Sequence, residues 1–423
     1  MIAQNQDMSA LPPLPLPPGI RARFVSGLNG LTMHVLEAGH ETPGRPAVLL
    51  LHGFPELAYS WRKILPRLAA AGYHAIAPDQ RGYGRTTGWD GSYDGDIASF
   101  RMPNLVRDAA ALVSALGYRS VAAVVGHDFG SPVAAYCALT RPEVFRSVVM
   151  MSAPFGGAPA ASTDASVHRE LAVLPRPRKH YQWYYSTRDA DGEMRHCAQG
   201  LHSFLRAYYH CKSADWPGNR PYRLRAWRAT ELAKLPSYYV MDLGKEMAQT
   251  VAEEMPSAAQ VAACRWLPEA ELGVYSSEFS RTGFQGGLQW YRCATRAEHL
   301  AELHPLAGRA IGVPAAFIAG KSDWGVYQRP GDFERMQRTA CERMTGCHLI
   351  DGAGHWVQQE KPGEVTALLL AFLREHAREK APASRRARGT GRRSPSGARA
   401  APRSSPSARR AAPARRRARR AGW

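Results

Sequence analysis

The chain has 423 residues and a formal net charge of +19, which allows one large domain with an insertion. Fourteen arginines and no acidic residue lie in residues 381–423, so the rest of the chain carries a net charge of only +5. The high charge therefore describes the C-terminal tail, and it does not identify the folded part as a nucleic-acid-binding domain.

The cysteines and the hydrophobic pattern indicate the cellular compartment in which the protein is expected. Seven cysteines are scattered along the chain without a C-x-x-C motif, and an odd number cannot pair fully, which favours reduced thiols. No apolar run reaches the length of a membrane span. The N-terminus lacks the basic and apolar segments of a secretory signal. We therefore expect a cytoplasmic protein with no membrane partner.

The first part of the chain alternates between strands and helices. Residues 1–19 form a proline-rich lead-in that cannot be helical. From Ile20 onward, two alternating segments around the turn Leu28-Asn29-Gly30 predict a hairpin. The hairpin strands are predicted at 23–26 and 31–38. The remaining pattern predicts strands at 47–51, 74–78, 121–125 and 147–152, and helices at 60–71, 103–116 and 131–140. This alternation predicts a doubly wound, mostly parallel sheet.

The pattern changes in the middle of the chain. From Phe155 to His304 the sequence is rich in aromatic residues and helix formers, which we interpret as a helical lid inserted into the sheet domain. Strands at 313–319 and 347–350 and a helix at 364–376 then resume the first pattern. The predicted organisation is a core at 20–154, a cap at 155–304 and the second part of the core at 305–380.

The tail at 381–423 consists mainly of Arg, Ala, Pro and Ser. Such a composition cannot bury enough apolar surface to fold, so we expect a disordered tail. Two alternatives remain open: a shifted reading frame in a GC-rich gene, and an arm that binds a polyanion. A nucleic-acid partner is expected only through this second alternative.

The most informative motif is VAAVVGHDFG at residues 121–130. A G-x-S-x-G turn after a strand presents a nucleophile above the sheet edge, and here the middle residue is Asp128. A carboxylate that attacks an sp³ carbon forms an alkyl ester, which water can cleave. Asp128 therefore predicts substrates such as epoxides or alkyl halides. The alternative, a simple helix cap, is disfavoured by the flanking Gly126 and Gly130.

A general base and its orienting acid follow in the order that this architecture uses, which is nucleophile, acid, histidine. Asp323 comes just after the predicted strand 313–319, and His355 lies in a glycine-rich loop after 347–350. Ligands bind beyond the carboxyl ends of such strands. Asp351 is the rival acid, which we interpret as a turn residue because it is so near His355 in sequence.

The segment HGFPE at residues 52–56 predicts the opposite wall of the site. The negative charge that develops on an attacked ester needs backbone donors. The N–H groups of Phe54 and Phe129 are the candidates for this oxyanion hole. His52 and His127 are predicted to be structural.

Taken together, the motifs HGFPE, DQRGYG, GHDFG, GKSD and GAGHW resemble, in order, those of the epoxide hydrolase branch of the α/β-hydrolase superfamily. The resemblance covers residues 20–376. It implies an α/β-hydrolase fold, in which a mostly parallel twisted sheet is flanked by helices and carries an inserted helical lid.

Two lid segments extend the resemblance. HYQWYY at 180–185 and GFQGGLQWYR at 283–292 are similar to the family's two tyrosine motifs. The resemblance implies that Tyr181 and Tyr291 donate hydrogen bonds to the epoxide oxygen. Ring opening creates an alkoxide, which a phenol is acidic enough to stabilise or protonate.

The chain departs from the family pattern beside the nucleophile. Phe129 replaces the usual Trp, and Gly130-Ser131 replaces a frequent Gly-Gly. In haloalkane dehalogenases the Trp at this position helps to hold the departing halide. A dehalogenase would need another donor here, such as Trp183 or Trp290. Fluoroacetate dehalogenases carry an Arg after the nucleophile, which is also missing.

The sequence thus predicts an enzyme that converts a small-molecule epoxide and water to a vicinal diol, without a metal or organic cofactor. The metal-binding motif H-E-x-x-H does not occur. We expect Trp183, Trp290 and Trp356 to contact substrate in a largely apolar pocket. The alternatives are a haloalkane or haloacid dehalogenase and a non-catalytic ligand-binding protein of the same fold. The oligomeric state is left open.

Overall fold

The computed structural model describes residues 11–160 and 166–376, all of which belong to one compact unit. Residues 1–10 and the tail at 381–423 lie outside the described residues, so the expectations for them stay predictions. No helix in the described part of the chain is long and apolar enough to cross a membrane.

An eight-stranded sheet forms the centre of the unit, in the order β1-β2-β4-β3-β5-β6-β9-β10. Its strands are β1 (Arg21–Leu28), β2 (Leu31–Ala38), β3 (Ala47–Leu51), β4 (His74–Pro78), β5 (Ala123–His127), β6 (Val148–Met151), β9 (Ala315–Gly320) and β10 (Met344–Ile350). β2 runs antiparallel to both β1 and β4, and the other pairs are parallel. The predicted α/β-hydrolase sheet is therefore confirmed.

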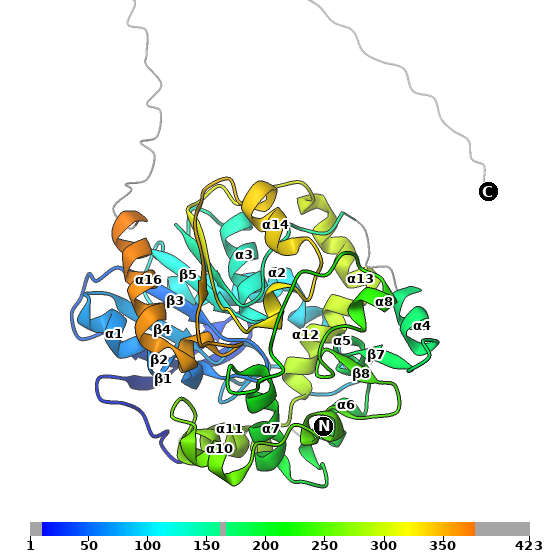
Figure 1. Ribbon diagram of the computed structural model, residues 1–423. Coiled ribbons are helices and arrows are strands. Elements are labelled where there is room, and N and C mark those ends of the chain that lie inside the picture. The colour runs from blue at the N-terminus through cyan, green and yellow to red at the C-terminus, as the bar shows by residue number, and fades with distance from the viewer. Residues whose placement is uncertain (1–10, 161–165, 377–423) are drawn as a thin grey trace, which may run out of the picture. The chain divides into compact units, whose positions relative to one another are not determined.

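Helices cover both faces of this sheet (Figure 1). Ala47, Leu49 and Leu51 of β3 face the core that holds α2 and α3, whereas Val48 and Leu50 face the core that holds α1 and α16. Burial on both faces explains why β3 is a continuous apolar run. The helices of this part are α1 (Leu65–Ala70), α2 (Met102–Ala115), α3 (Gly130–Thr140), α14 (Asp332–Arg335), α15 (Val357–Glu360) and α16 (Pro362–His376), with short helical turns η2 (Ala58–Trp61), η3 (Ile97–Phe100), η5 (Trp324–Val326) and η6 (Met336–Ala340).

The helix predicted at residues 60–71 is shorter than expected. The turn η2 ends at Trp61, and α1 begins only at Leu65, with Pro66 in its first turn. Proline has no N–H and is tolerated only where that group needs no helical partner, so a continuous helix through Pro66 is excluded.

Most elements between β6 and β9 are helical. They are α4 (Ser166–Ala172), α5 (Tyr181–Tyr184), α6 (Ala190–Arg195), α7 (Leu201–Lys212), α8 (Ala229–Leu232), α9 (Met247–Ala252), α10 (Ala258–Ala263), α11 (Glu269–Thr282), α12 (Gln285–Thr295), α13 (Ala297–Leu300) and the turn η4 (Ala301–Leu306). A two-stranded antiparallel sheet, β7 (Arg178–His180) and β8 (Val240–Asp242), was not predicted. Strands of three residues are too short to show a period-2 pattern. In Figure 1 these elements gather below and to the right of the main sheet.

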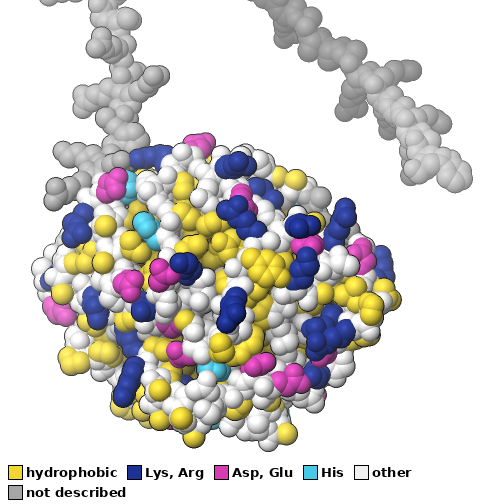
Figure 2. Space-filling model, viewed as in Figure 1, with side chains coloured by type: hydrophobic (Ala, Val, Ile, Leu, Met, Phe, Trp, Pro, Cys, Tyr) yellow, Lys and Arg dark blue, Asp and Glu magenta, His cyan; other side chains and the backbone are white. Residues whose placement is uncertain are grey.

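Basic and acidic side chains lie interspersed on the face of the unit seen in Figure 2. This mixture agrees with the small net charge that remains when residues 381–423 are set aside.

The parallel strands bring distant segments to one edge of the sheet. Phe54 follows β3, Asp128 follows β5, Asp323 follows β9 and His355 follows β10. Because the carboxyl ends of parallel strands meet at the same edge, all four residues gather where ligands bind in such sheets.

Candidate active site

Asp128 sits in a sharp turn between β5 and α3. Its φ of +50° is unusual for a residue other than glycine. A Cβ at Gly126 would collide with the Gly130 carbonyl, and one at Gly130 would collide with the backbone of Leu51. The two glycines therefore let strand and helix approach closely enough to hold Asp128 in this strained conformation.

The Asp128 carboxylate is held by a backbone donor and by the histidine. Its Oδ1 accepts the Phe54 N–H at 2.9 Å, and its Oδ2 lies 3.2 Å from Nε2 of His355. Phe129 is the residue directly before α3, where backbone N–H groups have no acceptor within the helix. A Cβ at Gly53 would collide with both the carboxylate and the Phe129 amide. The loop that follows β3 thus passes directly over the turn of Asp128.

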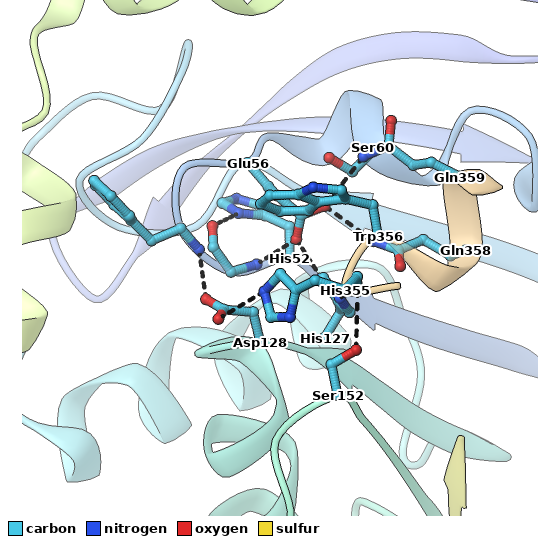
Figure 3. Close-up of polar contacts among 12 residues, drawn as sticks. His52, Glu56, Ser60, His127, Asp128, Ser152, His355, Trp356, Gln358 and Gln359 are labelled. Atoms are coloured by element: carbon cyan, nitrogen blue, oxygen red, sulfur yellow. Dashed lines mark hydrogen bonds and ion pairs between the residues drawn. The ribbon is translucent and has the colours of Figure 1, made fainter. Parts of the chain in front are cut away.

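His355 lies between two carboxylates. Its Nδ1 is 3.1 Å from Oδ1 of Asp323, and that oxygen also accepts the Gly325 N–H at 2.7 Å. Figure 3 shows His355 reaching toward Asp128. Asp351, the rival acid, is 82% exposed and forms an ion pair with Lys321. The structure brings Asp323 and not Asp351 to the histidine.

The electrostatics of the site favour an ionised Asp128 carboxylate. Burial would raise the pKa of Asp128, but the hydrogen bond and charge of His355, together with Lys212, outweigh it and hold that pKa well below its usual value. Burial likewise opposes ionisation of Asp323, and His355 again lowers the pKa. For His355, burial and Lys212 lower the pKa, while the two carboxylates raise it above the usual value.

Tyr181 on α5 and Tyr291 on α12 line the same cavity as Asp128. The volume of this cavity is about 520 Å³. Their ring centroids are 5.9 Å apart. Burial raises the pKa of both phenols, so both stay protonated and able to donate. The Tyr181 hydroxyl donates to Gln328 at 3.1 Å and accepts from Gln182 at 3.2 Å.

Comparisons with known proteins agree with this geometry. The model of the alpha/beta hydrolase fold family matches residues 46–362. Epoxide hydrolase A of Mycobacterium tuberculosis is 37% identical over 360 residues, covering 82% of this chain and 95% of that protein. The epoxide hydrolase of Caballeronia sordidicola is 32% identical, covering 82% and 92%. The chain belongs to the epoxide hydrolase branch of the α/β-hydrolase superfamily. An epoxide hydrolase structure from an endophytic Streptomyces is 31% identical, with a TM-score of 0.69, and covers 85% of this chain and 96% of that chain.

The three tryptophans that were predicted to contact substrate lie in different surroundings in the structure. Trp290 lines the cavity, but Trp183 and Trp356 do not. Trp183 packs against His168, with ring centroids 3.4 Å apart and the ring planes tilted by 37°. Trp356 lies beside His355, and its indole N–H donates to the Tyr209 carbonyl at 2.8 Å. Both rings are occupied by packing within the protein, which a sequence pattern of aromatic residues does not reveal.

The same tryptophans bear on the dehalogenase alternative. The Trp290 indole N–H donates to the Arg81 carbonyl at 2.9 Å, so it is not free to hold a halide. Trp183 is outside the cavity lining, and Phe129 has no side-chain donor. Neither substitute donor for halide is therefore available in this epoxide hydrolase.

The sequence interpretation missed Glu56, the last residue of HGFPE. Its carboxylate is buried and contacts His127 Nδ1 at 2.6 Å, and the His127 Nε2 lies 2.7 Å from the His355 carbonyl oxygen. Glu56 also accepts the Gly53 N–H at 3.1 Å. This buried contact between Glu56 and His127 thus links the loop after β3, the end of β5 and the loop of His355 (Figure 3). The available signal was an acidic residue in the loop that follows a buried strand.

Proposed function

We propose that this epoxide hydrolase converts epoxides to vicinal diols in two steps, through an ester on Asp128. The observation that carries the proposal is the position of the Asp128 carboxylate. It contacts the Phe54 amide and His355 on one side, and it shares a cavity with Tyr181 and Tyr291.

In the first step, an Asp128 oxygen attacks a ring carbon of the epoxide. A bond forms between that oxygen and the carbon while the carbon–oxygen bond of the ring breaks. The departing ring oxygen takes a proton from Tyr181 or Tyr291. The product is a hydroxyalkyl ester on Asp128, with one phenolate.

In the second step, His355 removes a proton from water, and the water oxygen attacks the ester carbonyl carbon. The Phe54 and Phe129 N–H groups stabilise the oxyanion. The bond from the carbonyl carbon to the diol oxygen breaks, and that oxygen takes the proton from His355. Ionisation of the regenerated carboxyl group returns a proton to the tyrosine, so one epoxide and one water give one diol.

Two further proposals concern organisation and location. We propose that residues 155–304 act as the lid between the core segments 20–154 and 305–380, since the tyrosines on α5 and α12 line the cavity. We also propose a cytoplasmic location, supported by seven cysteines that are all unpaired.

The test is to trap the ester. His355→Gln should still be alkylated by styrene oxide but should not hydrolyse the ester, so the intact mass should rise by one substrate. Peptide mapping should place the adduct on Asp128, and Asp128→Ala should give no adduct. The proposal fails if no epoxide forms an adduct with His355→Gln and the unmodified enzyme produces no diol.

A further inference from the structure

Lys212, the last residue of α7, is a buried lysine beside the active site, with only 3% of its surface exposed. Its ammonium lies over four aromatic rings, 5.2 Å from Tyr208, 5.9 Å from Tyr238, 5.1 Å from Tyr239 and 5.5 Å from Trp356. Within the described residues no carboxylate forms an ion pair with it. Since burying an unpaired charge is costly and cation–π contacts offset only part of that cost, its position calls for a functional reason.

The backbone of Lys212 is fastened to the loop of His355. The Lys212 carbonyl accepts the His355 N–H at 2.9 Å. Glu360 then joins the same two segments, because its carboxylate accepts the N–H groups of Ala214, Gly354 and Trp356, each at 2.9 Å. The backbone of Lys212 is therefore held at a fixed position relative to His355, and the four aromatic rings surround its ammonium.

The charges around His355 come from every element packed against it. They are Asp128 and His127 at the end of β5, Asp323 after β9, Glu56 after β3, Lys212 on α7 and Glu360 at the end of α15. Burial raises the pKa of Glu360 to about 7, and its carboxylate is bonded by three backbone N–H groups. The Glu56 carboxylate is already paired with His127. The balance at the reaction centre is thus set by Asp128, Asp323, His355 and Lys212.

This balance changes during the proposed reaction. Before alkylation, two carboxylates face Lys212 and His355, so a protonated His355 is favoured. Once Asp128 is an ester, Asp323 is the one negative charge of this group, and Lys212 already balances it. A neutral His355 is then favoured, which is the form that can remove a proton from water.

We propose that Lys212 is a positioning residue of the cap, whose buried charge keeps His355 neutral after Asp128 is esterified and so promotes ester hydrolysis. The inference rests on the proposed function. It concerns the second step: loss of the Lys212 charge should make His355 easier to protonate, so the hydrolysis rate should reach its plateau only at a higher pH.

Single-turnover measurements with styrene oxide over a pH series test this proposal. In Lys212→Met, the acidic limb of the pH–rate profile for ester hydrolysis should move to higher pH. The hydrolysis rate at pH 7 should fall about tenfold, while alkylation of Asp128 should still proceed. Lys212→Arg keeps the positive charge and should restore the pH–rate profile of the unmodified enzyme. Lys234→Met removes the same charge from an exposed position on the cap and should leave the limb unchanged. An unshifted limb in Lys212→Met, or an equal shift in Lys234→Met, overturns the proposal.

A second measurement does not depend on turnover or on the yield of the first variant. Asp128→Asn carries a neutral side chain in place of the ester, and NMR can follow the His355 ring, assigned by its loss in His355→Gln. Adding Lys212→Met should move the His355 titration to higher pH, and an unchanged titration overturns the proposal. A shifted titration in an enzyme that forms no adduct would support the Lys212 effect while rejecting the epoxide reaction.

Discussion

The Phe54 amide donates a 2.9 Å hydrogen bond to Oδ1 of Asp128, a residue 74 positions further along the chain. The donor is a backbone group, so it holds the carboxylate whatever side chain stands at position 54. The approach depends instead on Gly53, which leaves room for the turn of Asp128.

Gly53→Ala should therefore reduce kcat/KM by about a hundredfold, because a displacement of reacting groups by about 1 Å costs that much. The added Cβ would displace either Asp128 or the Phe129 amide. Gly192→Ala is the control, since a Cβ there meets no atom within 4 Å. Steady-state rates and melting temperatures of both variants separate a local effect from unfolding. Unchanged kcat/KM in Gly53→Ala would contradict the proposed geometry.

The two lid tyrosines should contribute unequally to alkylation. The Tyr181 hydroxyl is already hydrogen-bonded to Gln328 and Gln182, whereas that of Tyr291 has no such partner within the described residues. Tyr291→Phe should slow alkylation by about tenfold to a hundredfold, the range for one hydrogen bond to a charged group, and Tyr181→Phe should slow it less. Rapid-quench mass spectrometry measures both rates. Tyr185→Phe, which removes a neighbouring hydroxyl bonded to Tyr208, should match the unmodified enzyme.

Acid should destabilise the fold through Asp79. Burial opposes its ionisation, but His34, His52 and the Arg85 N–H lower its pKa to about 2. The unfolded value is about 3.9, so the stabilisation is present above pH 4 and is lost as the pH falls toward 2. Its size is about 2.6 kcal/mol for such a shift. Urea unfolding should show this loss in the unmodified protein and a smaller loss in Asp79→Asn. The exposed Asp351→Asn should follow the unmodified profile.

Removal of residues 381–423 should leave kcat and KM for styrene oxide unchanged. Each residue assigned to the reaction lies within 11–160 or 166–376, and the tail carries fourteen arginines without an acidic residue. Turnover by the shortened and complete chains, compared at two salt concentrations, checks this expectation. A loss of activity on deletion would give the tail a role in the reaction.

Local sequence predicted much of the core because its strands are buried on both faces. The strands at 47–51 and 74–78 agree with β3 and β4 at both ends, since continuous apolar runs have clear limits. Asp128, Asp323 and His355 could also be predicted from the sequence, because chain order and strand ends alone assign them to one edge of the sheet.

Other features depend on contacts between distant segments. Glu56 and His127 are in contact although they lie 71 positions apart in the sequence. The Lys212 ammonium contacts aromatic rings from three different segments of the chain. Trp183 and Trp290 look alike in sequence, yet only Trp290 lines the cavity. Tertiary packing decides which aromatic side chain faces the cavity, and the sequence pattern does not contain that information.

The hydrogen bond between the His355 amide and the Lys212 carbonyl has a mechanical consequence. Any hinge motion that lifts the end of α7 away from the core must break this bond and move the Lys212 ammonium away from Asp128, Asp323 and His355. If Lys212 acts as proposed, the ester cannot be hydrolysed efficiently while the protein is open on that side. Substrate and diol must therefore enter and leave along a path that keeps the hydrogen bond between His355 and Lys212 intact.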